Sequence, residues 1–347
     1  MSRARRRHPF LLLVLARMRE LMREPEVVFW VFIFPILLAV GLGIAFRNKP
    51  PDEIVVGVVD TAGSGPILAA LKPAGGFAVE TISPVEAATR LRLGKVAIVV
   101  VPGARYEYRY DPTRPDSVLA RQKVHDALQR AAGRTDPVEV TETMVTEPGA
   151  RYIDFLIPGL LGMNIMSGGM WGVGFLLVDM RTRKLLKRLI ATPMKRTDFL
   201  GAIMTSRIFL VLAEMALLLV FGRVIFHLAI QGSLWTITLL AVLGAFVFSG
   251  LGLLVASRTA KMETASGLMN LVMLPMFVFS GIFFSSDRFP AAVKPFVKAL
   301  PLTALNDALR AAILEGADLP SQAGRILVML AWGVLAFVVA LRIFRWN

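Results

Sequence analysis

Six long apolar runs divide this chain and constrain its fold more than any other feature of the sequence. The first, VVFWVFIFPILLAVGLGIAF at residues 27–46, is long enough as a helix to cross a hydrocarbon core of about 30 Å. Five more lie at about 155–178, 202–222, 234–256, 264–284 and 322–341. With 55% hydrophobic residues and a mean hydropathy of +0.63, the chain is expected to be a polytopic membrane protein.

Residues 47–150, between the first two runs, differ in character. They contain thirteen basic and thirteen acidic residues. EIVVGVVD and KVAIVVVPG are typical of strands, and SPVEAATRLRLG and DSVLARQKVHDALQRAAG are typical of helices that start at Ser or Asp caps. GSGP at 63–66 lacks the Gly-Lys-Ser/Thr of a phosphate loop and is interpreted as a turn. The predicted fold is an all-α transmembrane bundle of six helices in a 1+5 arrangement, with an inserted α/β domain.

Positive charge in short loops predicts the orientation in the membrane. With both termini cytoplasmic, the inner segments hold eighteen Lys and Arg residues and the short outer loops hold five. Residues 1–26 and the loop 179–198 are then cytoplasmic, and the 47–150 domain is extracytoplasmic. The net charge of +14 lies beside the apolar runs, so it indicates contact with membrane lipid and not with nucleic acid.

Two amphipathic segments are expected to lie at the membrane surface. Residues 1–26 predict a cytoplasmic interfacial helix. Its apolar face holds Leu11, Leu15, Met18 and Met22, and Arg19 and Arg23 project elsewhere. Within the five-span domain, 151–347, the stretch 289–316 predicts short outer interfacial helices.

The loop DMRTRKLLKRLIATPMKRTDF, at 179–199, carries seven Lys and Arg residues. Leu185, Leu186, Leu189 and Ile190 share one helical face. Thr192 can cap a second helix that starts at Pro193. Charge alone favours a surface helix held to anionic lipid, whereas the helix-turn-helix length favours a rigid docking element.

Several polar or small residues fall inside the spans. Arg207 is expected to extend to the inner interface, and Asn164 and Asn270 to associate helices. For Glu214 a place on a substrate path and a structural hydrogen bond stay open. Gly168 and Gly172, next to MSGGM, predict close helix packing within one chain or across a dimer. No catalytic or cofactor motif is present, the chain has no cysteine, and its three His are far apart, so no metal site is predicted.

Three stretches in chain order resemble one family. MRTRKLLKRLIATPMKRTDFLGAIMTSR is similar to the cytoplasmic loop of ABC type-2 export permeases. RELMREPEVVFWVFIFPILLAVGLGIAF resembles their entry into the first span, and LPLTALNDALR resembles their outer-helix motif. The resemblance covers nearly the whole chain. It implies the membrane subunit of an exporter in the bacterial cytoplasmic membrane, without enzyme activity of its own.

The same resemblance implies partners. A separate ABC ATPase subunit would hold ATP and magnesium, and a second copy of the chain or a related permease would complete the pathway. Residues 180–193 would be the coupling helix, beside an interfacial helix at 10–24. The coupling residues would be Met180, Thr182, Leu185, Leu186, Leu189, Ile190, Thr192 and Pro193. Two alternatives stay open: an ion-driven secondary transporter with Glu214 as its proton site, and a membrane-anchored extracytoplasmic sensor.

Overall fold

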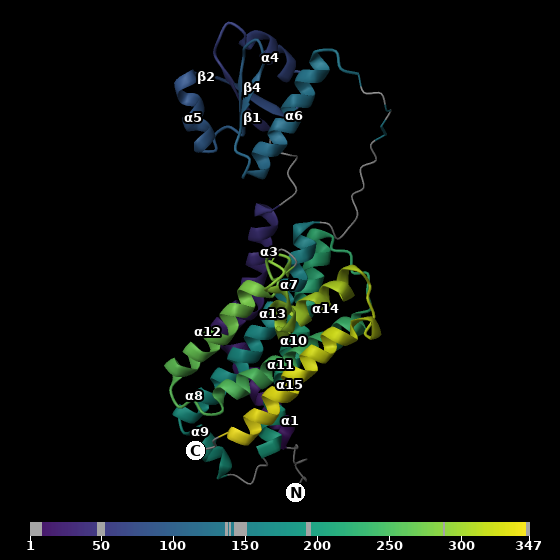
Figure 1. Ribbon diagram of the computed structural model, residues 1–347. Helices are drawn as coiled ribbons and strands as arrows, with labels where there is room; N and C mark the ends of the chain where they lie inside the picture. The colour runs from purple at the N-terminus through teal and green to yellow at the C-terminus, as the bar shows by residue number, and fades with distance from the viewer. Residues whose placement is uncertain are drawn as a thin grey trace. The chain divides into compact units, whose positions relative to one another are not determined.

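The computed structural model describes residues 9–46, 53–135, 138, 140–141, 151–191, 196–286 and 289–344. The chain forms two compact units (Figure 1). One is Asn48–Val145, and the other joins Met1–Arg47 to Thr146–Asn347. The larger unit is helical and the smaller contains a β-sheet, and each has its own hydrophobic core.

The larger unit starts with α1 (Pro9–Arg23), followed by α2 (Pro25–Val28), the π-helical η1 (Phe29–Ile33) and α3 (Phe34–Ala45). After the small unit come α7 (Tyr152–Gly169), the π-helical η2 (Met170–Phe175), α8 (Leu176–Thr182), α9 (Leu185–Ile190), α10 (Arg196–Phe226), α11 (Leu234–Ala256), α12 (Met262–Phe279), α13 (Lys294–Ala299), α14 (Pro301–Leu314), the 3₁₀ turn η4 (Pro320–Gln322) and α15 (Ala323–Ile343).

Within the described residues, six stretches are long and apolar enough to cross a membrane, as predicted. They are Pro25–Ala45, Tyr152–Thr182, Thr197–Phe226, Leu234–Ala256, Met262–Phe279 and Pro320–Ile343. The fifth ends at Phe279 instead of 284, because Gly281 adopts a φ of 68° that turns the chain. The predicted outer interfacial segment differs more. Almost every residue of α14 is buried, and α14 packs on α7, α11 and α15. Small side chains such as Ala304, Ala308 and Ala312 permit this close approach.

The small unit is an α/β fold with the strand order β2-β1-β3-β4. Its elements are β1 (Ile54–Val59), α4 (Ser64–Leu71), β2 (Phe77–Ile82), α5 (Pro84–Arg92), β3 (Ile98–Val101), β4 (Glu107–Arg109) and α6 (Pro115–Ala131). β1 pairs in parallel with β2 and β3, and β4 runs antiparallel to β3. Alternate residues of β1 face opposite sides. Val56 and Val58 join a core with α4 and α6, whereas Val59 joins one with α5.

Helix starts in the small unit follow the capping rules only in part. The predicted Ser83 cap is confirmed, since Ser83 and Glu86 form a reciprocal capping box. The interpretation of 63–66 as a turn is wrong, because α4 already begins at Ser64. The cap predicted at the start of DSVLARQ is also wrong. Pro115 occupies the first position of α6 and Arg114 the cap, as suits a residue without an N–H group.

The second and fourth spans form the centre of the bundle. In each, 67% of the apolar stretch is buried, against 22% in the fifth and sixth spans and 17% in the first. Their backbones touch at glycines. A Cβ added to Gly174 would lie 2.6 Å from the Gly252 carbonyl oxygen, and one added to Gly252 would lie 2.6 Å from that of Gly169. Gly169 and Gly174 are five residues apart and share this contact because η2 is π-helical, with i to i+5 bonding.

Within the described residues, the second span therefore touches the fourth at Gly169 and Gly174 and not at the predicted pair Gly168 and Gly172. Packing of that pair across a dimer stays a prediction. A Cβ at Gly168 would meet the guanidinium of Arg207, and one at Gly172 would meet nothing within 4 Å in this chain. The prediction assumed α-helical spacing throughout, and η2 departs from that spacing.

Gly174→Ala should push η2 away from α11, since the added methyl group meets backbone, at a cost of about 1–3 kcal/mol. The melting temperature and the monodisperse fraction in detergent should both fall. Gly267→Ala, on α12 with no atom of the described residues within 4 Å of the added Cβ, is the matched control and should change neither. A melting temperature that falls in Gly267→Ala and not in Gly174→Ala would contradict this packing.

Candidate functional site

The predicted cytoplasmic loop at the end of the second span forms a short helical hairpin. α8 ends at Thr182, whose hydroxyl donates to the Asp179 carbonyl at 2.8 Å. Lys184 then adopts a left-handed φ of 58°, which separates α8 from α9. In Figure 1, α8, α9 and the C-terminus lie at the same end of the larger unit.

The predicted coupling residues do not form one exposed apolar ridge. Leu186 is 1% exposed and belongs to the bundle core, contrary to its expected docking role. Met180 and Leu185 are half-buried and Thr182 is exposed. The side chains of Leu189 and Ile190, and all of Thr192 and Pro193, lie outside the described residues. Besides Thr182, the exposed side chains among the described residues of this hairpin are basic: Arg183, Lys184, Lys187 and Arg188.

Arg181, one of the seven basic residues of this loop, points into the bundle. Its Nη1 donates to the carbonyls of Ala256 at 2.7 Å and Thr259 at 2.5 Å, and its Nη2 donates to that of Ser257 at 3.3 Å. Its guanidinium carbon also lies 5.2 Å from the centre of the Phe344 ring. Nothing in the sequence pattern indicates these partners, which lie 75 or more residues away.

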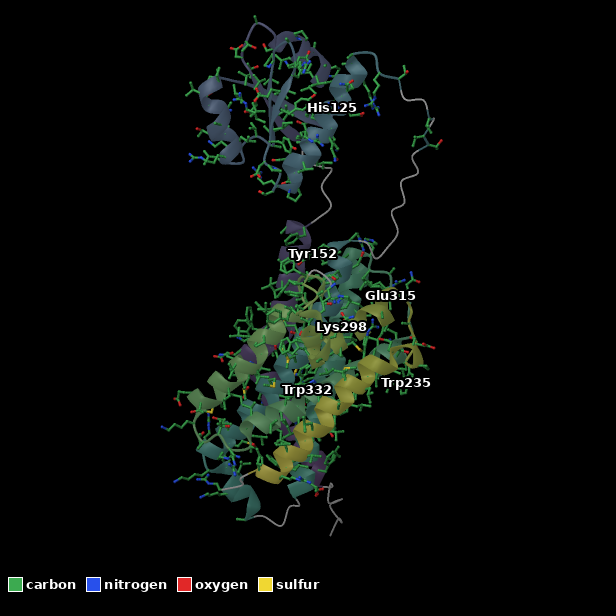
Figure 2. All side chains as sticks on the ribbon, in the orientation of Figure 1. His125, Tyr152, Trp235, Lys298, Glu315 and Trp332 are labelled. Carbon is green, nitrogen blue, oxygen red and sulfur yellow. The ribbon has the colours of Figure 1, made fainter. Side chains whose placement is uncertain are left out.

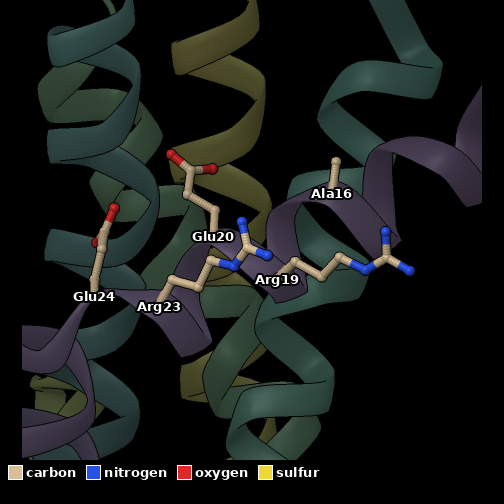
Figure 3. Close-up of a pocket in the computed structure, with 5 residues that line it drawn as sticks. All are labelled: Ala16, Arg19, Glu20, Arg23 and Glu24. Carbon is tan, nitrogen blue, oxygen red and sulfur yellow. The ribbon is translucent and has the colours of Figure 1, made fainter.

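Helix α1 packs on α10, and the contact of its predicted apolar face with the membrane surface stays a prediction. Its buried residues are Val14 and Leu21. Of the predicted apolar face, Leu11 and Met22 are exposed, and Leu15 and Met18 are half-buried. The free side also carries charge. Figure 3 shows a shallow pocket lined by Ala16, Arg19, Glu20, Arg23 and Glu24. The helix thus has one face for the bundle and another, part apolar and part charged, for the membrane surface or a partner.

Arg207 does not extend to the membrane interface, and that prediction is wrong. Its Nη1 and Nη2 donate to the two carboxylate oxygens of Glu214 at 2.9 and 3.2 Å. Both side chains are 5% exposed or less. The residues are seven apart, about two helical turns, so their side chains meet on one face of α10. Glu214 therefore makes the structural contact, the second of its two predicted roles.

Asn164 joins three spans, in agreement with its predicted role in helix association. Its carbonyl accepts from Arg207 Nη2 at 3.2 Å. Its side-chain Nδ2 donates to the Val31 carbonyl at 3.4 Å. Pro35 has no N–H to bond that carbonyl four residues earlier, so Asn164 supplies the missing donor. Asn270, in contrast, is exposed on α12 and associates no helices within this chain.

A second polar cluster, which the sequence did not predict as a site, lies in the LPLTALNDALR stretch. Asn306 donates to the Ser280 carbonyl at 2.8 Å. Arg310 donates to the carbonyls of Phe155, at 3.3 Å, and Gly281, and its guanidinium stacks 3.6 Å above the Phe155 ring. Burial lowers the pKa of Arg310 to about 10, with Asp307 opposing the shift. It stays charged at neutral pH, and it ties α14 to α7 and to the turn after α12.

Ionisable groups of the small unit form ordinary surface contacts. His125, on α6 (Figure 2), lies 3.3 Å from the Tyr108 hydroxyl through its Nδ1. Among the described residues, no group of three or more His, Asp or Glu is placed to hold a metal ion.

These features define a multi-pass membrane protein with an amphipathic helix before its first span and a basic helical hairpin between its second and third. The chain belongs to the ABC-2 family transporter protein family, which it matches over residues 25–342. It is a membrane component of an ABC-2 type transporter. It is also 26% identical over 218 residues to ABC transporter G family member 20 of Dictyostelium discoideum, a match that covers 62% of this chain. The chain spans 30% of that relative's length.

Removing one partner of the buried ion pair should destabilise the bundle. Arg207→Leu leaves the Glu214 carboxylate without a cation in an apolar interior, at a cost of about 3–5 kcal/mol. The double variant Arg207→Leu with Glu214→Leu removes both charges and should recover most of the lost melting temperature in detergent. A double variant less stable than the single one would contradict the pairing.

Proposed function

We propose that this chain is the permease subunit of an ABC type-2 exporter. With a second copy of itself, or a related permease, it forms the translocation pathway, and a separate ATPase subunit that holds ATP and magnesium drives it. The observation that carries the proposal is the family match over residues 25–342, together with the helical hairpin at the end of the second span.

The exposed surface of α8–α9 suggests how the ATPase docks. Lys184, Lys187 and Arg188 are exposed, whereas Leu186 is buried in the bundle. We therefore assign the docking contact to the basic side of the hairpin and an acidic surface of the ATPase. Leu186 holds α9 to the spans. Closure of the ATPase pair on ATP would move the hairpin and shift the population between inward- and outward-facing states.

The positive-inside pattern supports both termini in the cytoplasm of a bacterial inner membrane, with the small unit outside. The ion-driven alternative is less well supported. Both carboxylate oxygens of Glu214 accept hydrogen bonds from Arg207, so a contact within α10 accounts for this buried carboxylate without a role in ion transport. A sensor needs one or two spans, and this chain has six candidates among its described residues.

The docking proposal is tested by charge reversal. Lys187→Glu with Arg188→Glu should weaken ATPase binding about tenfold or more, because two attractive contacts become repulsive. The measurement is co-purification of the ATPase with the tagged protein from native membranes in mild detergent, followed by an ATPase assay. Arg105→Glu with Lys123→Glu, in the small unit, is the matched control. An ATPase retained equally by both double variants would rule out this docking surface.

The orientation is tested by cysteine labelling, because the natural chain has none. Ala104→Cys in the small unit should react with a membrane-impermeant maleimide in intact cells whose outer membrane has been opened. Ala191→Cys, exposed beside α9, should react only after the inner membrane is broken. The reverse pattern would invert the proposed topology.

A further inference from the structure

Arg181 connects two inner segments of the bundle that lie far apart in sequence. It belongs to the last turn of α8, directly before the hairpin. Its guanidinium donates to three carbonyls at the end of α11 and in the turn that follows, those of Ala256, Ser257 and Thr259. The last carbonyls of a helix have no partner inside it and carry a partial negative charge. A cation with several donors is therefore suited to this position.

The planar guanidinium is what makes this contact specific. It presents donors in a fixed fork and can engage several carbonyls at once, and its face remains free for the Phe344 ring at 5.2 Å. A Lys ammonium keeps the charge but not the fork. The Arg181 side chain, which extends from α8, thus contacts both the end of α11 and Phe344, the residue after α15.

Arg181 contacts the turn at 256–259, and side chains of this turn stabilise it by hydrogen bonds to the backbone. The Ser257 hydroxyl donates to the Leu254 carbonyl at 2.6 Å, and the Thr259 hydroxyl donates to that of Val255 at 2.7 Å. Two residues after Thr259 the chain reaches the cap of α12. In α12 only 22% of the apolar stretch is buried. A stiff turn therefore links Arg181 to one of the least anchored spans.

We propose that Arg181 is a positioning residue through which displacement of the α8–α9 hairpin reaches α12. When the hairpin moves, the guanidinium carries the 256–259 turn with it, and the inner end of α12 follows. α11 stays in place because its backbone is packed against η2 at glycines. This inference rests on the proposed coupling of the hairpin to an ATPase.

The test uses a single cysteine at Thr264→Cys, exposed near the start of α12, as a reporter in the complex with the ATPase. Its rate of reaction with a water-soluble maleimide is measured without nucleotide and with ATP plus vanadate. The rate should change several-fold with nucleotide in the reporter protein. Arg181→Lys should abolish that change while the ATPase still co-purifies. Arg109→Lys is the matched control, since Arg109 lies on β4 of the small unit, outside the hairpin, and pairs with Glu107 of its own strand.

The outcomes separate the inference from the function on which it rests. A nucleotide-dependent rate that persists in Arg181→Lys overturns the role of Arg181. A rate that never changes in the reporter protein overturns it too, because α12 would not respond to ATP. If no ATPase co-purifies with the unaltered protein, the proposed function itself fails.

A second measurement needs no variant and covers the case in which Arg181→Lys does not fold. Hydrogen exchange of the unaltered complex is followed in peptides that cover 176–184 and 254–262. ATP should change protection in both peptides together. A change in the first peptide alone would overturn the connection.

Discussion

Three arginines inside the larger unit donate hydrogen bonds to backbone carbonyls of other parts of the chain. Arg207 donates to the carbonyl of Asn164, Arg310 to that of Phe155, and Arg181 to the end of α11. In an apolar interior an unpaired polar group is costly, and each of these contacts joins elements that are distant in sequence. The relative placement of the spans therefore depends on a few arginines more than on any single apolar contact.

The burial of the spans divides the bundle into a fixed centre and a less constrained periphery. The second span and α11 are largely buried, and the backbone of η2 meets that of α11 at Gly174 and Gly252, where no side chain can adapt. α12 and α15 expose most of their apolar surface, which suits lipid or another chain. Movement driven from the cytoplasmic hairpin is accordingly expected in α12 and not in the centre.

Local features of the chain were predictable from the sequence, whereas contacts between distant elements were not. The six spans and the strands at 54–59 and 98–101 were predictable because apolar length and β-branched runs are local properties. The contacts of Leu186 and Arg207 were predicted wrongly, because the residues that share a helical face do not indicate which element packs against that face. Leu186 meets the bundle, and Arg207 finds a carboxylate two turns along its own helix.

The sequence by itself determined the class of protein, through six apolar runs of spanning length with a neutral α/β insertion between the first two. Only the tertiary structure decided which small residues touch, because the π-helical turn at 170–175 changes the spacing from Gly169 to Gly174. It also decided the role of Arg181, whose partners lie 75 or more residues away. The type and spacing of side chains are local properties of the sequence. The hydrogen-bond partner of a side chain depends on which helix packs next to it in the tertiary structure.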